Sequence, residues 1–241
     1  MFRDRIFFLP KEGELGQDRF ARSYTRNVWV LCDGASEGYD GGGWARDLCR
    51  CTMRFASIQR AVRRARIIRT RKIQSWEDLD WSSILAMARG SYSTLLRVRI
   101  LPRTIEVEGV GDTVVFFLKG YEWVHVFPSA EIEFFQKDPC LLSDRLQDEI
   151  PPIVTAKIYW RKARITSLLL ATDALAAYLV KIEKEERREI FTLLHRGTVS
   201  RIRKTLAEEM KNMRIKRDDL SFVWLELKMD TSLRRREGHE Q

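Results

Sequence analysis

Short apolar segments, separated by turn residues, dominate the middle and the end of the chain. Pro102-Arg103 and Gly111-Asp112 stand between the central segments, as turns between strands do. Because such short turns join neighbouring antiparallel strands, the pattern predicts antiparallel sheets. The predicted strands cover 27–33, 91–100, 104–108, 113–119, 122–126, 159–165, 167–171 and 220–227.

Helical spacing of apolar residues is found in three other stretches. These are 44–72, 81–89 and 174–211, the last with a break near Arg196-Gly197. The segment 127–152 contains several prolines and is predicted to be an ordered but irregular crossing. Helices near both ends of the chain predict an α+β fold, a four-layer α-β-β-α sandwich with two central antiparallel sheets flanked by helices. A single domain is expected over 1–230, followed by a charged, disordered tail over 231–241.

The composition is that of a globular protein with a basic surface. Of 241 residues, 44% are hydrophobic and 32% are charged, and the net charge of +9 favours anionic substrates or partners. No uncharged run approaches the roughly 20 apolar residues that a membrane helix needs. Charged residues within the first eight positions exclude a secretory signal there, so a cytoplasmic protein is expected. The 4 cysteines lack zinc-ligand spacing and are expected to be reduced thiols.

Arginines are concentrated on one side of the predicted helix over 44–72. They form either a solvated face or a docking surface for nucleic acid or an acidic partner. The stretch lacks the aromatic residues that alternate with basic ones in single-strand binders, which favours the solvated face. The arginines are Arg54, Arg60, Arg63, Arg64, Arg66, Arg69 and Arg71.

Four aspartates stand where predicted strands begin or end. They are Asp33, Asp112, Asp173 and Asp218. Carboxylates at strand ends can converge at one edge of a sandwich, where they repel one another unless a cation neutralises them. Oxygen ligands of this kind suit Mg²⁺ or Mn²⁺. Each aspartate alone is equally compatible with an ordinary turn, because Asp favours turns by bonding its own backbone.

These aspartates lie in segments that together resemble the metal-dependent serine/threonine protein phosphatases of the 2C type, and in particular short bacterial members. The resemblance extends in order from residue 17 to residue 227. The segments that resemble family elements are Gln17-Asp18-Arg19-Phe20, the strand that ends in Asp33-Gly34, 91–96, Gly111-Asp112-Thr113, 169–173 and Arg217-Asp218-Asp219-Leu220-Ser221. A Ser-His-Asp hydrolase is not indicated, since the chain contains no Gly-x-Ser-x-Gly motif.

The resemblance implies a set of metal ligands and catalytic residues. Asp33 would bridge two tightly bound Mn²⁺ or Mg²⁺ ions, and the Gly34 carbonyl would ligate one of them. Asp173 and Asp218 would ligate the other ion, so Asp33, Asp173 and Asp218 are the implied catalytic residues. Asp112 would share a third, weakly held ion with Asp173. The implied nucleophile is a water bridged between the two tight ions, so no catalytic Cys or Ser is expected.

The chain departs from the family pattern near its first motif. Gln17 stands where many members have Glu, and either Asp18 or Glu37 is expected to restore the charge, with Asp18 counted among the metal ligands. Ala174 replaces the glycine that usually follows the metal-binding aspartate. The family's upstream phosphate-binding arginine is missing from the matching stretch. Arg19 and Arg22 are therefore the candidate substrate-binding residues, although each is also compatible with an exposed loop arginine.

The sequence thus predicts a phosphoprotein phosphatase that acts on phosphoserine and phosphothreonine in signalling. Its expected partners are a phosphorylated protein and a cognate Ser/Thr kinase or that kinase's target, with no membrane or nucleic acid, and the protein is expected to be a monomer. The alternative is a catalytically weak or inactive family member that acts as a phosphoprotein-binding or regulatory module.

Overall fold

The computed structural model describes residues 2–11, 16–36, 38–72 and 81–227, which form two five-stranded antiparallel sheets. Sheet one has the order β1 (Arg3–Leu9), β12 (Leu220–Glu226), β11 (Ser167–Ala171), β7 (Val114–Lys119) and β8 (Glu122–Phe127). Sheet two has the order β10 (Val154–Ile158), β6 (Ile105–Val110), β5 (Leu95–Ile100), β3 (Val28–Cys32) and β2 (Arg19–Ser23). The short strands β4 (Tyr92–Ser93) and β9 (Leu142–Ser143) pair with each other.

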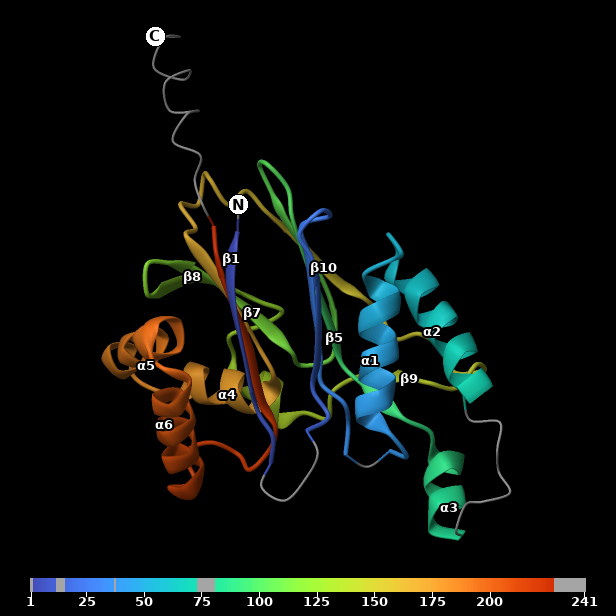
Figure 1. Ribbon diagram of the computed structural model, residues 1–241. Coiled ribbons are helices and arrows are strands. Elements are labelled where there is room, and N and C mark those ends of the chain that lie inside the picture. Colours follow the sequence, from blue (N-terminus) through green and yellow to red (C-terminus); the bar gives the residue numbers. More distant parts are fainter. Residues whose placement is uncertain (1, 12–15, 37, 73–80, 228–241) are drawn as a thin grey trace, which may run out of the picture.

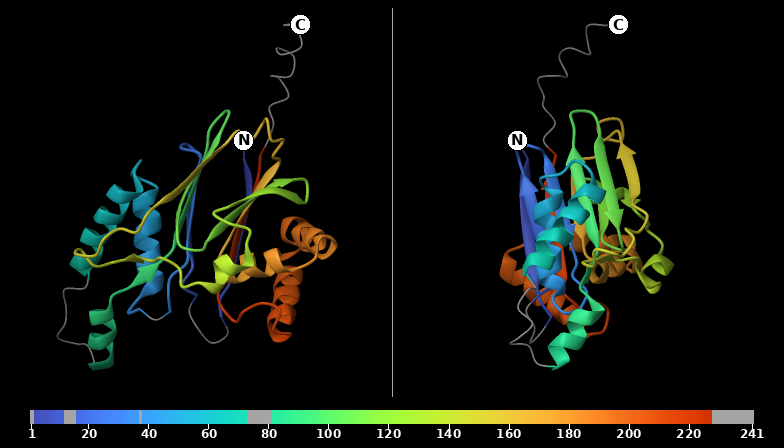
Figure 2. Two further views of the ribbon diagram at one scale, coloured as in Figure 1. Left: turned by 180° about the vertical axis from the view of Figure 1, so that it is seen from behind. Right: turned by 90° about the vertical axis from the view of Figure 1, so that its right-hand side faces the viewer.

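Helices cover the outer faces of the two sheets, so the molecule has four layers (Figures 1 and 2). The helices α1 (Gly41–Thr52) and α2 (Ile58–Lys72) pack on sheet two, and α3 (Trp81–Arg89) follows them in the chain. On sheet one lie α4 (Asp173–Lys181), α5 (Lys184–Arg196) and α6 (Val199–Lys211). The crossing between the two halves contains the 3₁₀ helix η1 (Ile132–Gln136). Among the described residues, no helix is both long enough and apolar enough to span a bilayer.

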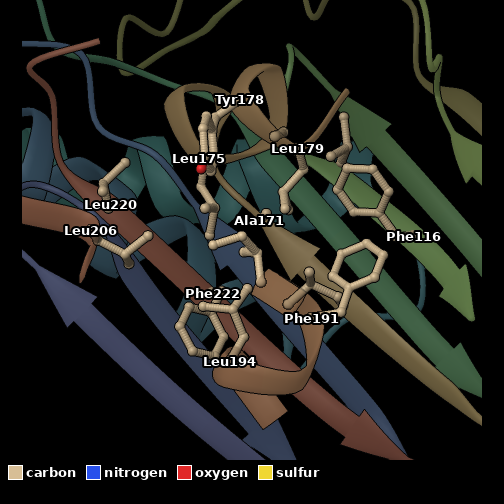
Figure 3. Close-up of a cluster of buried hydrophobic side chains, with 14 of the residues drawn as sticks. Phe116, Ala171, Leu175, Tyr178, Leu179, Phe191, Leu194, Leu206, Leu220 and Phe222 are labelled. Carbon is tan, nitrogen blue, oxygen red and sulfur yellow. The ribbon is translucent and has the colours of Figure 1, made fainter. Parts of the chain in front are cut away.

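Side-chain alternation on the strands produces three hydrophobic layers. On β3, Trp29 and Leu31 face the space between the sheets, whereas Val30 faces α1 and α2. On β11, Leu170 points between the sheets, and Leu169 points toward α4–α6. Strands buried on both faces explain why these segments are apolar at every position. Figure 3 shows the outer cluster of sheet one, where side chains from α4–α6 meet those of β7, β11 and β12.

The predicted four-layer architecture is confirmed, but several element boundaries are wrong. The strand predicted over 159–165 is instead β10, which ends at Ile158 and is followed by turns. The strand predicted over 91–100 is interrupted at Thr94, and no strand was predicted for β1 or β2. Predictions for Glu37 and for the tail over 231–241 lie outside the described residues.

The helix predicted over 44–72 is wrong as a single element, since it divides into α1 and α2 at 53–57. The cause is a tertiary contact, because the buried Arg97 of β5 donates to the carbonyl oxygens of Phe55 (3.0 Å) and Ala56 (2.6 Å). Ser57 then begins α2, with its hydroxyl 3.5 Å from the Arg60 amide. A long-range donor therefore stabilises carbonyls that an unbroken helix would satisfy internally.

The arginines of α2 do not all lie on a solvated face, which corrects the preferred interpretation of that helix. Arg66 is buried and donates to the carbonyls of Ser143 (3.0 Å) and Asp148 (2.7 Å). Arg69 is 5% exposed and pairs with Asp40 at 2.8 Å and Asp144 at 3.5 Å. These two side chains attach α2 to the central crossing, whereas others such as Arg63 are exposed.

Candidate active site

The predicted aspartates face one another at the end of the sandwich where β12 begins, the lower end in Figure 1. Asp33 follows the last residue of β3, and Asp173 follows β11 after Thr172. Asp112 precedes β7 and Asp218 precedes β12, which run antiparallel to β11. Strand ends and strand starts therefore meet at the same edge. Asp18, just before β2, joins them from the edge strand of sheet two.

The backbone of Asp33 is held by hydroxyl groups from the adjacent strand. The Asp33 amide donates to Thr94 Oγ1 at 3.0 Å, and the Ser93 hydroxyl donates to the Asp33 carbonyl at 2.8 Å. Thr94 Oγ1 also lies 2.7 Å from Thr113 Oγ1, which connects this turn to the one that carries Asp112. The interruption of the strand at Thr94 thus positions the carboxylate of Asp33 relative to that of Asp112.

Gln17 holds the loop that follows Asp33. With its amide nitrogen facing that loop, Gln17 donates to the carbonyl oxygens of Gly34 (3.1 Å) and Ala35 (3.0 Å). A Cβ on Gly34 would come within 2.6 Å of the Gly41 backbone at the start of α1, so only glycine fits there. An amide at position 17 can make these donations, whereas an ionised Glu would place a carboxylate against two carbonyls.

Asp18 is a buried carboxylate without a partner. It is 5% exposed, and neither carboxylate oxygen has a hydrogen-bond partner among the described residues. Burial raises its pKa to about 7, partly opposed by the neighbouring side chains of Ser221 and Asp33. The pKa of Asp33 lies well above its usual range, because the carboxyl is removed from water and faces Asp18 and Asp173. These groups resist ionisation as long as no cation lies among them.

Asp112, which precedes β7 in sheet one, also has a raised carboxyl pKa. Gly111 precedes it with a φ of +93°, a conformation that glycine adopts readily. The carboxyl of Asp112 is buried, and that burial, followed by the charge of Asp173, raises its pKa to about 6. Its high pKa reflects the same crowding of like charges.

A lysine, not anticipated from the sequence, lies between two of the predicted ligands. The Lys216 ammonium is 3.0 Å from Asp218 Oδ2 and 3.4 Å from Asp173 Oδ2. Its side chain is 66% exposed, so this pairing is weak and reversible. Asp219 has a separate role, because it accepts from the backbone amides of Lys11 (2.8 Å) and Gln17 and fastens the N-terminal segment to β12.

The two candidate substrate arginines are in different places. Arg19 lies beside Asp18, but its guanidinium donates to the carbonyls of Gly16 and Asp18, each at 2.7 Å. Arg22 pairs with Asp4 at 2.5 Å, and the structure does not bring it to the aspartates. A cavity of about 450 Å³ adjoins Asp18. Its lining includes Ile6, Phe8, Leu9, Pro10, Arg19, Phe20, Asp219 and Ser221.

The donor set fits a hard divalent cation by its chemistry. Carboxylates that pair with no cation of the described residues, as at the buried Asp18 and the partly buried Asp33, are the oxygen ligands that Mg²⁺ and Mn²⁺ prefer. In their present orientations, no three His, Cys, Asp or Glu side chains of the described residues form a cluster that could hold a metal ion.

Solved structures of phosphatases share this architecture. A bacterial serine phosphatase superposes with a TM-score of 0.65 at 12% identity, covering 96% of this chain and 100% of that one. The Mycobacterium tuberculosis serine/threonine phosphatase PstP/Ppp superposes with a TM-score of 0.63 at 13% identity, over 95% and 99% of the two chains. The chain has the fold of the 2C-type phosphatases. The Staphylococcus aureus serine/threonine phosphatase Stp1 is similar as well, with a TM-score of 0.61 at 12% identity over 95% and 96%.

No protein-family model and no curated protein sequence matches this chain. The likeness to a known family is thus confirmed for the fold, over nearly the whole chain. Sequence reasoning missed the roles of Lys216 and Gln17. The signal for Lys216 was its position two residues before Asp218, next to a predicted ligand.

Proposed function

We propose that this protein is a metal-dependent phosphatase of phosphoserine and phosphothreonine in proteins. The observation that carries the proposal is the buried Asp18, whose carboxylate has no hydrogen-bond partner of opposite charge among the described residues and faces Asp33 at the end of a sandwich with a phosphatase fold. Strongly raised carboxyl pKa values, together with a cavity beside them, are typical of functional sites. A purely structural role leaves the unpaired burial of Asp18 unexplained, because such burial destabilises the fold.

The residues that would hold Mn²⁺ or Mg²⁺ are Asp33, the Gly34 carbonyl, Asp173 and Asp218, with Asp18 and Asp112 beside them. When bound, such cations supply a Lewis acid that polarises the phosphoryl oxygens and lowers the pKa of water. Gln17 keeps the Gly34 loop in place, and Thr94 keeps Asp33 in place. The carboxylates would hold the charge that such ions require, and the burial of Asp18 and Asp112 limits access of bulk water there.

The cavity beside Asp18 favours a protein substrate over a small phosphate ester. Ile6, Phe8 and Phe20 give it apolar walls, while Asp18 and Asp219 form its polar end. An apolar side chain next to the phosphorylated residue would bury its surface there, and burial of apolar surface contributes to binding. A small aryl phosphate should therefore be a weaker substrate than a phosphopeptide with an apolar neighbour.

The direct test measures phosphate release from phosphoserine and phosphothreonine peptides in Mn²⁺, in Mg²⁺ and in chelator. We expect release only when a divalent cation is present. Equal turnover in chelator would contradict the proposal.

A second candidate is an inactive module that binds phosphoproteins, and Lys216 is the observation that favours it. An ammonium between Asp173 and Asp218 neutralises two predicted ligands without a metal. Calorimetry with Mn²⁺ separates the two candidates. Tight binding of Mn²⁺ supports the phosphatase, whereas absence of binding together with retained affinity for a phosphopeptide supports the module.

A further inference from the structure

The helix layer on sheet one leaves one end of β1 and β12 uncovered. Along these two strands the cross-strand pairs Leu9–Leu220 and Phe7–Phe222 pack under α4–α6. Arg5 is opposite Trp224, and Arg3 is opposite Glu226, where the outer face becomes polar. A cavity of about 570 Å³ lies here, rimmed by the end of α5.

This cavity is distinct from the aspartate site. Asp218 precedes β12, and Glu226 is the last of its 7 residues. At about 3.3 Å per residue, the two ends of the strand are roughly 20 Å apart. β1 starts and β12 ends at the top of Figure 1, whereas β12 begins, after Asp218, at the lower end. The proposed phosphatase function therefore does not account for the cavity.

A chain of hydrogen bonds makes one wall of the cavity rigid. Tyr121 Oη lies 2.9 Å from His195 Nδ1, and His195 Nε2 lies 2.5 Å from Glu226 Oε1. The imidazole of His195 stacks on the indole of Trp224, with centroids 4.8 Å apart and planes at 9°. Since both ring nitrogens of His195 are engaged, the histidine acts as a fixed support and not as a nucleophile.

Three arginines and two carboxylates line the cavity, and the carboxylate of Glu226 is held by His195. Arg5 is committed to the carbonyl oxygens of His195 (2.8 Å) and Gly197. Asp4 also contributes to the lining, but its carboxylate bonds Arg22 at 2.5 Å and Trp29 Nε1 at 3.2 Å on the other face of β1.

Two guanidinium groups remain available for a ligand. Within the part of the chain that the structure describes, the side chains of Arg3 and Arg196 make no ion pair or hydrogen bond. Both are exposed at the rim, and Arg196 lies over the Tyr121 ring at 5.8 Å. Planar guanidinium groups of this kind recognise oxyanions through paired N–H donors.

The deep wall of the cavity carries a donor without an acceptor. Trp224 is 1% exposed, and its indole Nε1–H has no partner among the described residues. Buried donors in native proteins are almost always satisfied, so one that is not calls for an explanation such as a ligand or an ion. A ligand oxygen in the cavity is the acceptor that this donor lacks.

We propose that this cavity binds the phosphate group of a small phosphorylated molecule through Arg3, Arg196 and the indole N–H of Trp224. Several N–H donors lining one cavity suit the oxygens of a phosphate better than the two of a carboxylate. The volume of about 570 Å³ exceeds what a bare anion needs and falls in the range of small-molecule sites. The ligand is therefore a phosphomonoester of modest size, and binding needs no metal.

Inorganic phosphate is the probe for this site, added to the full chain in chelator. Chelator removes divalent cations, so phosphate cannot bind at the aspartate site through a bound cation. The readout is the set of indole N–H resonances of ¹⁵N-tryptophan-labelled protein, in which Trp224→Phe assigns one of the 7 tryptophans. We expect phosphate to move the Trp224 resonance, and sodium chloride at matched ionic strength to leave it in place.

Two double variants, each of which removes two positive charges, test the proposed phosphate site. Arg3→Gln with Arg196→Gln should weaken phosphate binding at least about tenfold, because two charge-assisted hydrogen-bond donors are lost. Arg203→Gln with Lys204→Gln removes two exposed charges from α6, and should leave the affinity nearly unchanged. A Trp224 resonance that does not move throughout the titration, or equal weakening in both double variants, would overturn the proposal.

Discussion

Two places in the molecule differ in whether a cation pairs with their carboxylates. Asp40 and Asp144 pair with the buried Arg69. The pKa of Asp40 lies below its usual value: burial raises it, but the hydrogen bonds from Arg69 and the Gly43 amide lower it by more. Asp18 meets no cation, and its pKa rises to about 7 through burial. Paired burial of this kind stabilises the attachment of α2, whereas unpaired burial destabilises the fold and awaits a ligand.

The largest expected effect concerns Asp33. Asp33→Ala removes the carboxylate that faces both Asp18 and Asp173. Turnover should fall about a thousandfold, because the variant loses several kcal/mol of the transition-state stabilisation that a metal supplies. The fold should remain, since it is the backbone of Asp33, and not its side chain, that bonds Thr94. Turnover with Mn²⁺ and the melting temperature are the two measurements. Turnover equal to that of wild type would show that Asp33 does not belong to the active site.

Removal of Arg69 should cause the largest loss of stability. Arg69→Ala leaves the carboxylates of Asp40 and Asp144 without their cation, which should lower the free energy of unfolding by about 2–3 kcal/mol. Arg63→Ala on the same helix removes an exposed charge and should change it by less than about 0.5 kcal/mol. Urea denaturation of both variants measures the contrast. Equal effects would show that Arg69 is no more structural than its exposed neighbour.

The metal-free protein should become more stable as the pH falls from about 8 to 5. Folded Asp18 has a pKa of about 7 against a usual value of 3.8, so the folded state binds more protons than the unfolded state in this window. Stability therefore falls as pH rises. Asp18→Asn should flatten this dependence and stabilise the metal-free protein near neutral pH by about 1–2 kcal/mol. Urea denaturation in chelator across the pH range provides the measurement, and an unchanged slope in Asp18→Asn would contradict the assignment.

The smallest effect is expected at Lys216. Lys216→Met removes the ammonium between Asp173 and Asp218, and should raise Mn²⁺ affinity by about two- to fivefold, a modest gain because the side chain is exposed. Lys162→Met is the control, since it removes an exposed charge from the turn after β10. Calorimetry measures both variants. Lower Mn²⁺ affinity in Lys216→Met would show that the ammonium does not compete with a cation.

The local pattern of apolar and turn residues was sufficient to predict most of the helices and strands. The run Ser167–Ala171 was predicted to be a strand with the same bounds, and Trp81–Arg89 a helix with the same bounds. The aspartates at strand ends were found because their positions depend on strand order alone. The break between α1 and α2 was missed, because Arg97, a residue on β5, causes it.

The sequence by itself determined the layered fold and the end of the sandwich at which Asp33, Asp112 and Asp173 meet. Apolar periodicity and turn residues determine local structure, and they depend on residues that are neighbours in the sequence. Only the tertiary structure decided which charges are paired. Arg69 and Asp144 are far apart in sequence yet paired, and Asp18 is buried with no cationic partner in the part of the chain that the structure describes. Solvation and Coulomb energies depend on the whole surrounding volume, so the same residue types receive opposite roles in different places.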